Sequence, residues 1–178
     1  MPVHLYSAVS LDAAVAGPKH ELDWLADPST IAEDLGYNRL LATVEVIVMG
    51  RNTWEFCASL ETWPYPDHEC ILVSSTHPEG RRFDEVPWEK EVWVVGGARL
   101  IGAAMDAGHV TRMTLTVHPV VLGQGAIPFT TTKARTSWRL VAEIGKYRSG
   151  TAFRTCSIMV DLPDPDGPTI RYKCPTIF

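Results

Sequence analysis

The stretch that decides the fold reads Val44-Glu-Val-Ile-Val-Met-Gly-Arg-Asn-Thr-Trp-Glu55. Its first half is apolar and β-branched, which predicts a buried strand that ends at a glycine and leads directly into a helix. The free backbone N–H groups at a helix N-terminus carry partial positive charge and bind anions. Arg51 and Thr53 add a guanidinium and a hydroxyl that suit phosphate oxygens. The same residues are equally typical of a helix that binds nothing, with Asn52 opening a capping box.

The composition indicates an ordinary globular domain. The chain has 178 residues, of which 46% are hydrophobic and 21% are charged. The net charge is -5, and no run of Lys or Arg could neutralise a nucleic-acid backbone. No apolar stretch approaches the roughly 20 residues that span a bilayer, and the four cysteines and six histidines lack metal-ligand spacing. We therefore expect a cytoplasmic domain that has no metal and binds neither nucleic acid nor a membrane.

Short apolar runs alternate with helical patterns, which predicts an α/β fold: a twisted, mostly parallel sheet with flanking helices and a C-terminal antiparallel hairpin. Helices are predicted from Ser29 or Thr30 to about Ala42, and from Gly97 to about Ala107. The domain is predicted to span residues 1–160, and four prolines indicate an irregular tail at 161–178. The predicted strands are residues 3–10, 44–49, 70–74, 92–95, 111–119, 138–147 and 152–160.

Two further strand ends carry residues that suit a ligand. Ser74 and Ser75 end one strand with hydroxyls, and Gly96-Gly97 followed by Arg99 ends another. In open α/β sheets, ligands bind at the carboxyl ends of the strands. Three such ends, two of them with an arginine, predict a site for a polyphosphate ligand. Each pattern taken singly is also common in ordinary turns.

Asp34 is the candidate acid. On the predicted helix it lies three residues after Ile31, on the apolar face, where burial would raise its pKa and suit it to general-acid catalysis. A carboxylate near a helix N-terminus is also typical of simple dipole stabilisation. Trp24 fits either a lid over a heterocycle or the core, and Thr116 fits either a ligand contact or a cross-strand pair.

These motifs resemble a known family. Met49-Gly-Arg-Asn-Thr-Trp-Glu55, Ser74-Ser75 and Gly96-Gly97-Ala-Arg99 are similar, in order and spacing, to the NADPH-binding segments of dihydrofolate reductases. Gly17, Trp24 and Asp34 continue the match, which covers about residues 3–160. The stretch from Leu115 to Gly125 is more similar to the reductase domain of the bifunctional riboflavin-pathway deaminase/reductase (the RibD C-terminal domain family) and its stand-alone relatives.

The resemblance implies a dihydrofolate reductase-like three-layer sandwich that uses NADPH, with a cis Gly96–Gly97 peptide, and a homodimer, as in many stand-alone relatives. The residues implied for the cofactor are Ala8, Gly17, Gly50, Arg51, Asn52, Thr53, Ser74, Ser75, Gly96, Gly97, Ala98, Arg99 and Leu100. The catalytic residues implied are Asp34, Thr116 and Trp24, with Thr116 holding a water that relays a proton from Asp34. The substrate-binding residues implied are Asp34, Tyr37, Trp54 and His68.

His68 departs from the pattern of dihydrofolate reductases, which place there the arginine that pairs with the folate carboxylate. An imidazole cannot reproduce that bidentate pair. We therefore expect hydride transfer to a C=N or C=O of a smaller pyrimidine- or pterin-like heterocycle, similar to the riboflavin-pathway reduction of 5-amino-6-(5-phosphoribosylamino)uracil. The alternatives are a true dihydrofolate reductase and a non-catalytic NADPH-binding module on the same fold.

Overall fold

The computed structural model describes residues 2–25, 34–127, 139–149 and 153–161. In chain order, its elements are β1 (Val3–Val9), α1 (Tyr37–Leu41), β2 (Val46–Gly50), α2 (Arg51–Ala58), β3 (Glu69–Val73), the 3₁₀ turn η2 (Phe83–Glu85), β4 (Val92–Gly96), α3 (Ala98–Asp106), β5 (Arg112–Val117), β6 (Arg139–Ser149) and β7 (Phe153–Asp161). The seven strands follow the predicted order, with bounds that differ by a few residues. None of the described helices is long and apolar enough to cross a bilayer.

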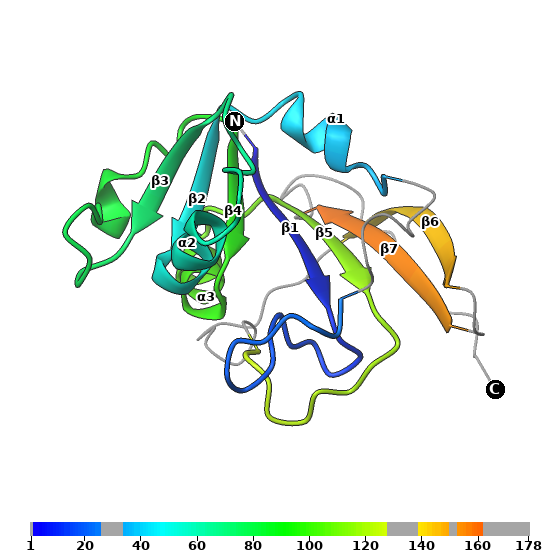
Figure 1. Ribbon diagram of the computed structural model, residues 1–178. Coiled ribbons are helices and arrows are strands. Elements are labelled where there is room, and N and C mark those ends of the chain that lie inside the picture. Colours follow the sequence, from blue (N-terminus) through cyan, green and yellow to red (C-terminus); the bar gives the residue numbers. More distant parts are fainter. Residues whose placement is uncertain (1, 26–33, 128–138, 150–152, 162–178) are drawn as a thin grey trace.

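A single sheet organises the described residues, with the strand order β3-β2-β4-β1-β5-β7-β6 (Figure 1). The first five strands of that order are parallel to their neighbours. In contrast, β7 is antiparallel to both β5 and β6. The predicted α/β class, the mostly parallel sheet and the C-terminal hairpin are therefore confirmed. Because parallel strands share a direction, the carboxyl ends of β1, β2, β3, β4 and β5 lie at one edge of the sheet.

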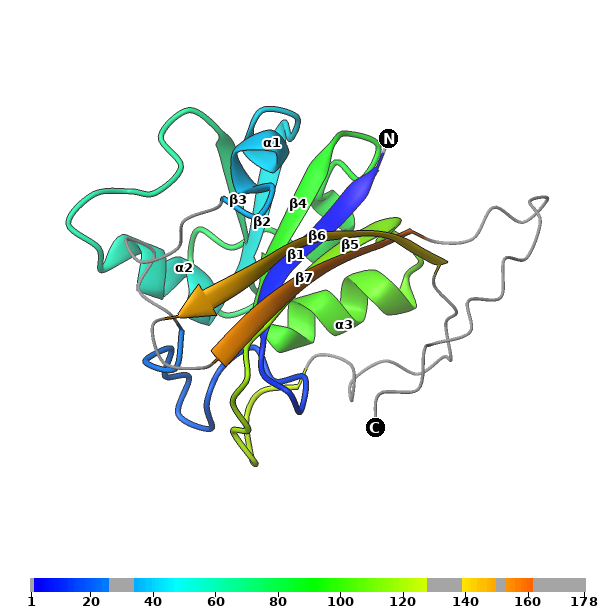
Figure 2. The same cartoon turned by 90° about the vertical axis from the view of Figure 1, so that its right-hand side faces the viewer.

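Each face of the sheet packs against its own core. Val46 and Val48 of β2 join the core that contains the buried residues of α3, whereas Ile47 and Met49 join the core beneath α1 and α2. All four side chains are 0% exposed. A strand buried on both faces has no polar alternation, which explains the continuous apolar run in the sequence. The result is three layers, with α1 and α3 on opposite sides of the strands (Figure 2).

The core beneath α1 and α2 is rich in aromatic rings. Trp93 of β4 contacts Tyr6, Tyr37 and Tyr65 edge-on, with ring centroids 5.4 to 6.2 Å apart. Such edge-to-face pairs place the positive ring edge against the negative ring face and stabilise the cluster beyond its buried area. We call the following six residues the aromatic cluster: Tyr6, Tyr37, Trp54, Trp63, Tyr65 and Trp93.

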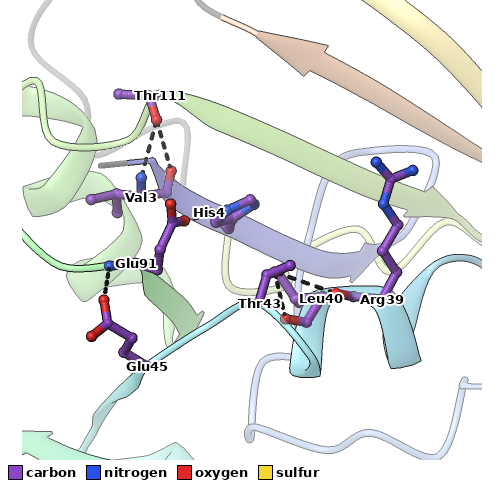
Figure 3. Close-up of polar contacts among 8 residues, drawn as sticks. All are labelled: Val3, His4, Arg39, Leu40, Thr43, Glu45, Glu91 and Thr111. Atoms are coloured by element: carbon purple, nitrogen blue, oxygen red, sulfur yellow. Dashed lines mark hydrogen bonds and ion pairs between the residues drawn. The ribbon is translucent and has the colours of Figure 1, made fainter.

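The amino ends of the strands are closed by structural polar contacts (Figure 3). The Thr111 hydroxyl accepts a hydrogen bond from the Val3 backbone nitrogen at 3.0 Å. The backbone nitrogen of Glu91 donates to the carboxylate of Glu45 at 3.1 Å, and the Glu91 carboxylate lies 3.3 Å from Nε2 of the buried His4. These contacts join the starts of β1, β2, β4 and β5 at the edge opposite the predicted site.

One prediction and one alternative interpretation about helices are wrong. The first predicted helix is shorter than expected, because α1 begins only at Tyr37. Leu35 and Gly36 adopt φ angles of 50° and 85°, which a right-handed helix cannot include. The alternative interpretation, in which Asn52 opens a capping box, does not hold, because α2 begins at Arg51 and its N-cap is Gly50, which has no side chain. The expected helix start at Ser29 or Thr30 lies outside the described residues. Of the tail predicted at 161–178, Asp161 is the last residue of β7, and the rest lies outside the described residues.

Candidate functional site

Two helices begin where β2 and β4 end side by side. β2 ends at Gly50 and α2 begins at Arg51, while β4 ends at Gly96 and α3 begins at Ala98. Both helices are long enough to present several unpaired backbone N–H groups at this edge. We call this arrangement the glycine cradle, defined by Gly50, Gly96 and Gly97.

The glycine cradle is closely packed. A Cβ atom built on Gly50 would lie 3.3 Å from the Gly97 nitrogen and 3.5 Å from the Gly96 oxygen. Gly96 adopts a φ of 152°, which L side chains rarely adopt, and the Gly96–Gly97 peptide is cis, as the resemblance implies. The Thr53 hydroxyl lies 3.4 Å from the Cβ position of Gly96. No side chain of these glycines covers the backbone amides, so the cradle fits a pyrophosphate group.

A turn after β3 supports Arg51 at the same edge. The Arg51 guanidinium Nη1 donates to the Thr76 hydroxyl at 3.3 Å, and its Nε lies 3.7 Å from the Glu55 carboxylate. Ser74 shapes the turn, because its Oγ accepts hydrogen bonds from the backbone nitrogens of Thr76 and His77 at 3.2 and 3.1 Å. The Arg51 side chain is 52% exposed, so its guanidinium is accessible to a ligand.

The other predicted cofactor residues differ in exposure. Ser75 and Arg99 are exposed. Leu100, a residue of α3, is only 7% exposed and belongs to the core on that side of the sheet. Ala8 is half-buried on β1, and Gly17 lies in the loop that follows β1. The structure therefore brings most of the predicted set to one edge of the sheet. Those residues are Gly50, Arg51, Asn52, Thr53, Ser74, Ser75, Gly96, Gly97, Ala98, Arg99 and Leu100.

Asp34 is not the buried acid that the helical pattern predicted. It precedes α1, is exposed, and accepts hydrogen bonds from the backbone nitrogens of Gly36 and Asn38 at 3.0 and 3.1 Å. These hydrogen bonds hold the pKa of Asp34 below its usual value. The prediction of a raised pKa is wrong, because the left-handed turn at Leu35 directs the carboxylate to backbone donors. Asp34 is thus ionised at neutral pH and acts as a hydrogen-bond acceptor.

The predicted substrate-binding residues are divided between the aromatic cluster and the start of β3. Tyr37 contacts Tyr6 and Trp93, whereas the Trp54 ring packs on Trp63 at 4.9 Å. His68 lies just before β3, and its Nε2 donates to the Leu41 carbonyl at 3.0 Å. That hydrogen bond joins α1 to β3 and occupies the ring nitrogen.

Thr116 and Trp24 both lie near the end of β5, Thr116 on the strand itself and Trp24 against His118, which follows the strand. Thr116 is 5% exposed on β5, in register with Ala8, and its hydroxyl is one of the groups that act on the pKa of Tyr6. The Trp24 indole lies edge-on to His118 at 5.4 Å. The buried N–H of Trp24 has no hydrogen-bond partner in the described part of the chain. An unpaired buried donor costs about 1–3 kcal/mol, so a ligand oxygen bound there would be stabilised.

Two loops beside the site are hydrogen-bonded to each other: residues 10–16, which follow β1, and residues 118–126, which follow β5. We call this pair of loops the loop clamp. All of this second segment except Ala126 lies within the stretch that resembles riboflavin-pathway reductases. The clamp is built from backbone hydrogen bonds of 2.8 to 2.9 Å, which are Leu11 N to Val120 O, Val15 N to Ala126 O, and Ala126 N to Ala16 O.

Asp12 and Gly125 strengthen the loop clamp, a role that no sequence pattern indicated for either residue. The Asp12 carboxylate accepts hydrogen bonds from the backbone nitrogens of Leu122 and Gly123 at 3.1 and 2.8 Å. A Cβ atom on Gly125 would lie 2.5 Å from the Ala14 Cβ, so only glycine allows the loops to meet. An Asp shortly after a strand is a weak signal, because its partners lie more than 100 residues away.

Comparisons with known proteins identify relatives of the chain. A family model described as the RibD C-terminal domain matches residues 89–152. The chain is 31% identical over 138 residues to the uncharacterized protein YwjB of Bacillus subtilis (strain 168), covering 68% of this chain and 78% of YwjB. It is 26% identical over 162 residues to the uncharacterized protein YyaP of the same organism, covering 75% of this chain and 83% of YyaP.

A solved structure shares the fold. It is the crystal structure of a Shewanella sp. PV-4 protein whose name assigns it to riboflavin biosynthesis, and it superposes with a TM-score of 0.73 at 21% sequence identity. The match covers 92% of this chain and 100% of the other.

Proposed function

Because the chain belongs to the RibD C-terminal domain family, we propose that it is an NADPH-dependent reductase of a pyrimidine- or pterin-like heterocycle. The observation that carries this proposal is the glycine cradle, since two adjacent helix N-termini with exposed arginines suit a dinucleotide phosphate. The aromatic cluster beneath α1 provides apolar and aromatic surface of the kind that lines sites for flat rings.

The residues of the cradle fit the phosphate groups of NADPH. Gly50 and Gly97 would leave the amides of α2 and α3 open to the pyrophosphate. The Arg51 guanidinium, together with the Thr76 hydroxyl, would hold the adenosine 2′-phosphate. When bound, NADPH supplies a hydride for an electron-poor carbon of the substrate.

The residues near α1 fit a small heterocycle better than a folate. The ionised Asp34 can accept a hydrogen bond from a ring N–H, and the unpaired Trp24 N–H can donate one to a ligand oxygen. His68 is hydrogen-bonded to Leu41, and an imidazole offers no fork for a substrate carboxylate. The combination favours a ring that carries both N–H and carbonyl groups.

The test combines ligand binding and turnover. We expect NADPH to raise the melting temperature more than NADH at equal concentration, because Arg51 would contact the additional phosphate. We expect NADPH oxidation with 5-amino-6-(5-phosphoribosylamino)uracil or 7,8-dihydrobiopterin, and much slower oxidation with dihydrofolate. Equal shifts with the two cofactors would contradict the phosphate assignment. If the protein bound NADPH but none of the three compounds caused NADPH oxidation, it would be a non-catalytic module.

A further inference from the structure

Tyr6 connects the aromatic cluster to the predicted catalytic residues. It lies on β1, between β4 and β5, and its ring contacts Tyr37 and Trp93 with centroids 6.0 and 6.2 Å away. Among the neighbours of its hydroxyl, the charge of Asp34 raises the pKa of Tyr6 and the hydroxyl of Thr116 lowers it. Tyr6 and Ala8 are two residues apart on one strand, so their side chains share a face about 7 Å apart.

The Tyr6 hydroxyl is only weakly held by the backbone. It donates to the Leu35 carbonyl at 3.3 Å, which is longer than the usual O–H···O distance of about 2.7–2.8 Å. Leu35 is a non-glycine residue with a φ of 50°, a conformation that costs about 1–2 kcal/mol. A long hydrogen bond to a strained turn contributes little to stability, so the hydroxyl can exchange it for a ligand acceptor.

The surroundings of Tyr6 keep its hydroxyl protonated. Burial, and then the negative charge of Asp34, raise the pKa of Tyr6 to about 12. The titratable groups that act on the phenol are Asp34, which precedes α1, and Tyr37 on α1. At neutral pH the phenol is therefore a hydrogen-bond donor beside a carboxylate that only accepts. This donor–acceptor pair is complementary to a ring that presents a carbonyl oxygen or ring nitrogen next to an N–H.

We propose that Tyr6 is a substrate-binding residue whose hydroxyl donates a hydrogen bond to a carbonyl oxygen or ring nitrogen of the heterocycle, while Asp34 accepts from the neighbouring ring N–H. The inference rests on the proposed function, because it takes a heterocycle as the ligand of the aromatic side of the site. It also narrows the substrate class to rings with a cyclic amide or ureide edge, as in pyrimidinediones and pterins.

The probe for this contact is lumazine, a pteridine-dione with such an edge. We would titrate it without NADPH into the wild-type protein, Tyr6→Phe and Thr43→Val, following tryptophan fluorescence. We expect Tyr6→Phe to raise the Kd about 5- to 10-fold, the effect of losing one hydrogen bond. Thr43→Val is the matched control, because it removes a hydroxyl that also donates to a backbone carbonyl, that of Leu40 at 2.9 Å, but lies outside the aromatic cluster (Figure 3). Its Kd should equal that of the wild type.

The outcomes separate this proposal from the proposed function. The role of Tyr6 would be overturned if Tyr6→Phe had the same Kd for lumazine as the wild type. It would also be overturned if Tyr6→Phe and the control variant raised this Kd equally. Failure of the wild type to bind lumazine would overturn it as well. NADPH binding is measured separately by thermal shift, and we expect it to be unchanged in Tyr6→Phe. A protein that binds lumazine through Tyr6 but does not bind NADPH would refute the cofactor assignment alone.

Discussion

Gly50 lies against Gly97 across the ends of β2 and β4, with 3.3 Å between the Cβ position of Gly50 and the Gly97 nitrogen. Helices α2 and α3 begin at this contact. The shape of the glycine cradle therefore depends on the absence of a side chain at position 50. A stability measurement and a binding measurement on one variant can test this dependence together.

We expect Gly50→Ala to lower the melting temperature by about 2–4 °C, equivalent to about 1 kcal/mol in a domain of this size. The backbone at Gly50, with φ -79° and ψ 168°, is ordinary for alanine, so the cost comes from the methyl group pressing on Gly97. The same displacement should reduce the thermal shift produced by NADPH. A variant with the wild-type shift would show that the ligand does not use the cradle.

Arg51→Gln tests the phosphate contact. We expect this variant to lose most of the difference between the thermal shifts with NADPH and NADH, because glutamine cannot pair with the 2′-phosphate. The matched control is Arg82→Gln, which removes an exposed arginine that pairs with Asp84 and Glu85 near η2. The control should keep the wild-type preference. The same loss of preference in both variants would indicate a general charge effect.

The fold could be predicted largely from the sequence, because its main signals are local. The apolar stretch from Val46 to Met49 and the glycines at positions 50, 96 and 97 specify buried strands and their ends without reference to distant residues. The cradle follows from the same signals, since parallel strands bring their carboxyl ends to one edge.

The substrate side of the site could not be predicted in the same way. The position of Asp34 depends on the conformation of Leu35, and helical spacing gives no warning of a left-handed residue there. The proposed role of Tyr6 depends on its contacts with Leu35 and Tyr37, which lie in a different segment of the chain. Gly125 is likewise constrained by Ala14 in another loop. Each of these features is a tertiary contact rather than a local pattern.

The environment of Asp34 predicts a pH-dependent contribution to stability. Its pKa is lower in the folded protein than in the unfolded chain, because backbone N–H groups of Gly36 and Asn38 bind the carboxylate. Its stabilisation is therefore fully present above the unfolded pKa and is lost as the pH falls through the folded value. We expect the melting temperature of the wild type to exceed that of Asp34→Asn at pH 7, with the gap closing below about pH 4. A constant gap would contradict this assignment.

Asp12→Ala should loosen the loop clamp without unfolding the protein. The amides of Leu122 and Gly123 would lose their acceptor, so we expect faster hydrogen–deuterium exchange at these two positions. Asp84→Ala is the control, because it removes an exposed carboxylate that pairs with Arg82 elsewhere. Unchanged exchange at both amides in Asp12→Ala would show that the backbone pairs alone hold the loops.

Gly125→Ala should be the most damaging glycine substitution in the loop clamp. Its Cβ would lie 2.5 Å from the Ala14 Cβ and 2.6 Å from the Ala16 oxygen, so the two loops must separate. We expect a loss of about 1–3 kcal/mol in the free energy of unfolding, measured by urea denaturation. Gly123→Ala is the comparison, because nothing lies within 4 Å of its Cβ and only its φ of 73° opposes the change. Equal losses would mean that backbone strain, rather than the close approach of the loops, sets the requirement for glycine in this segment.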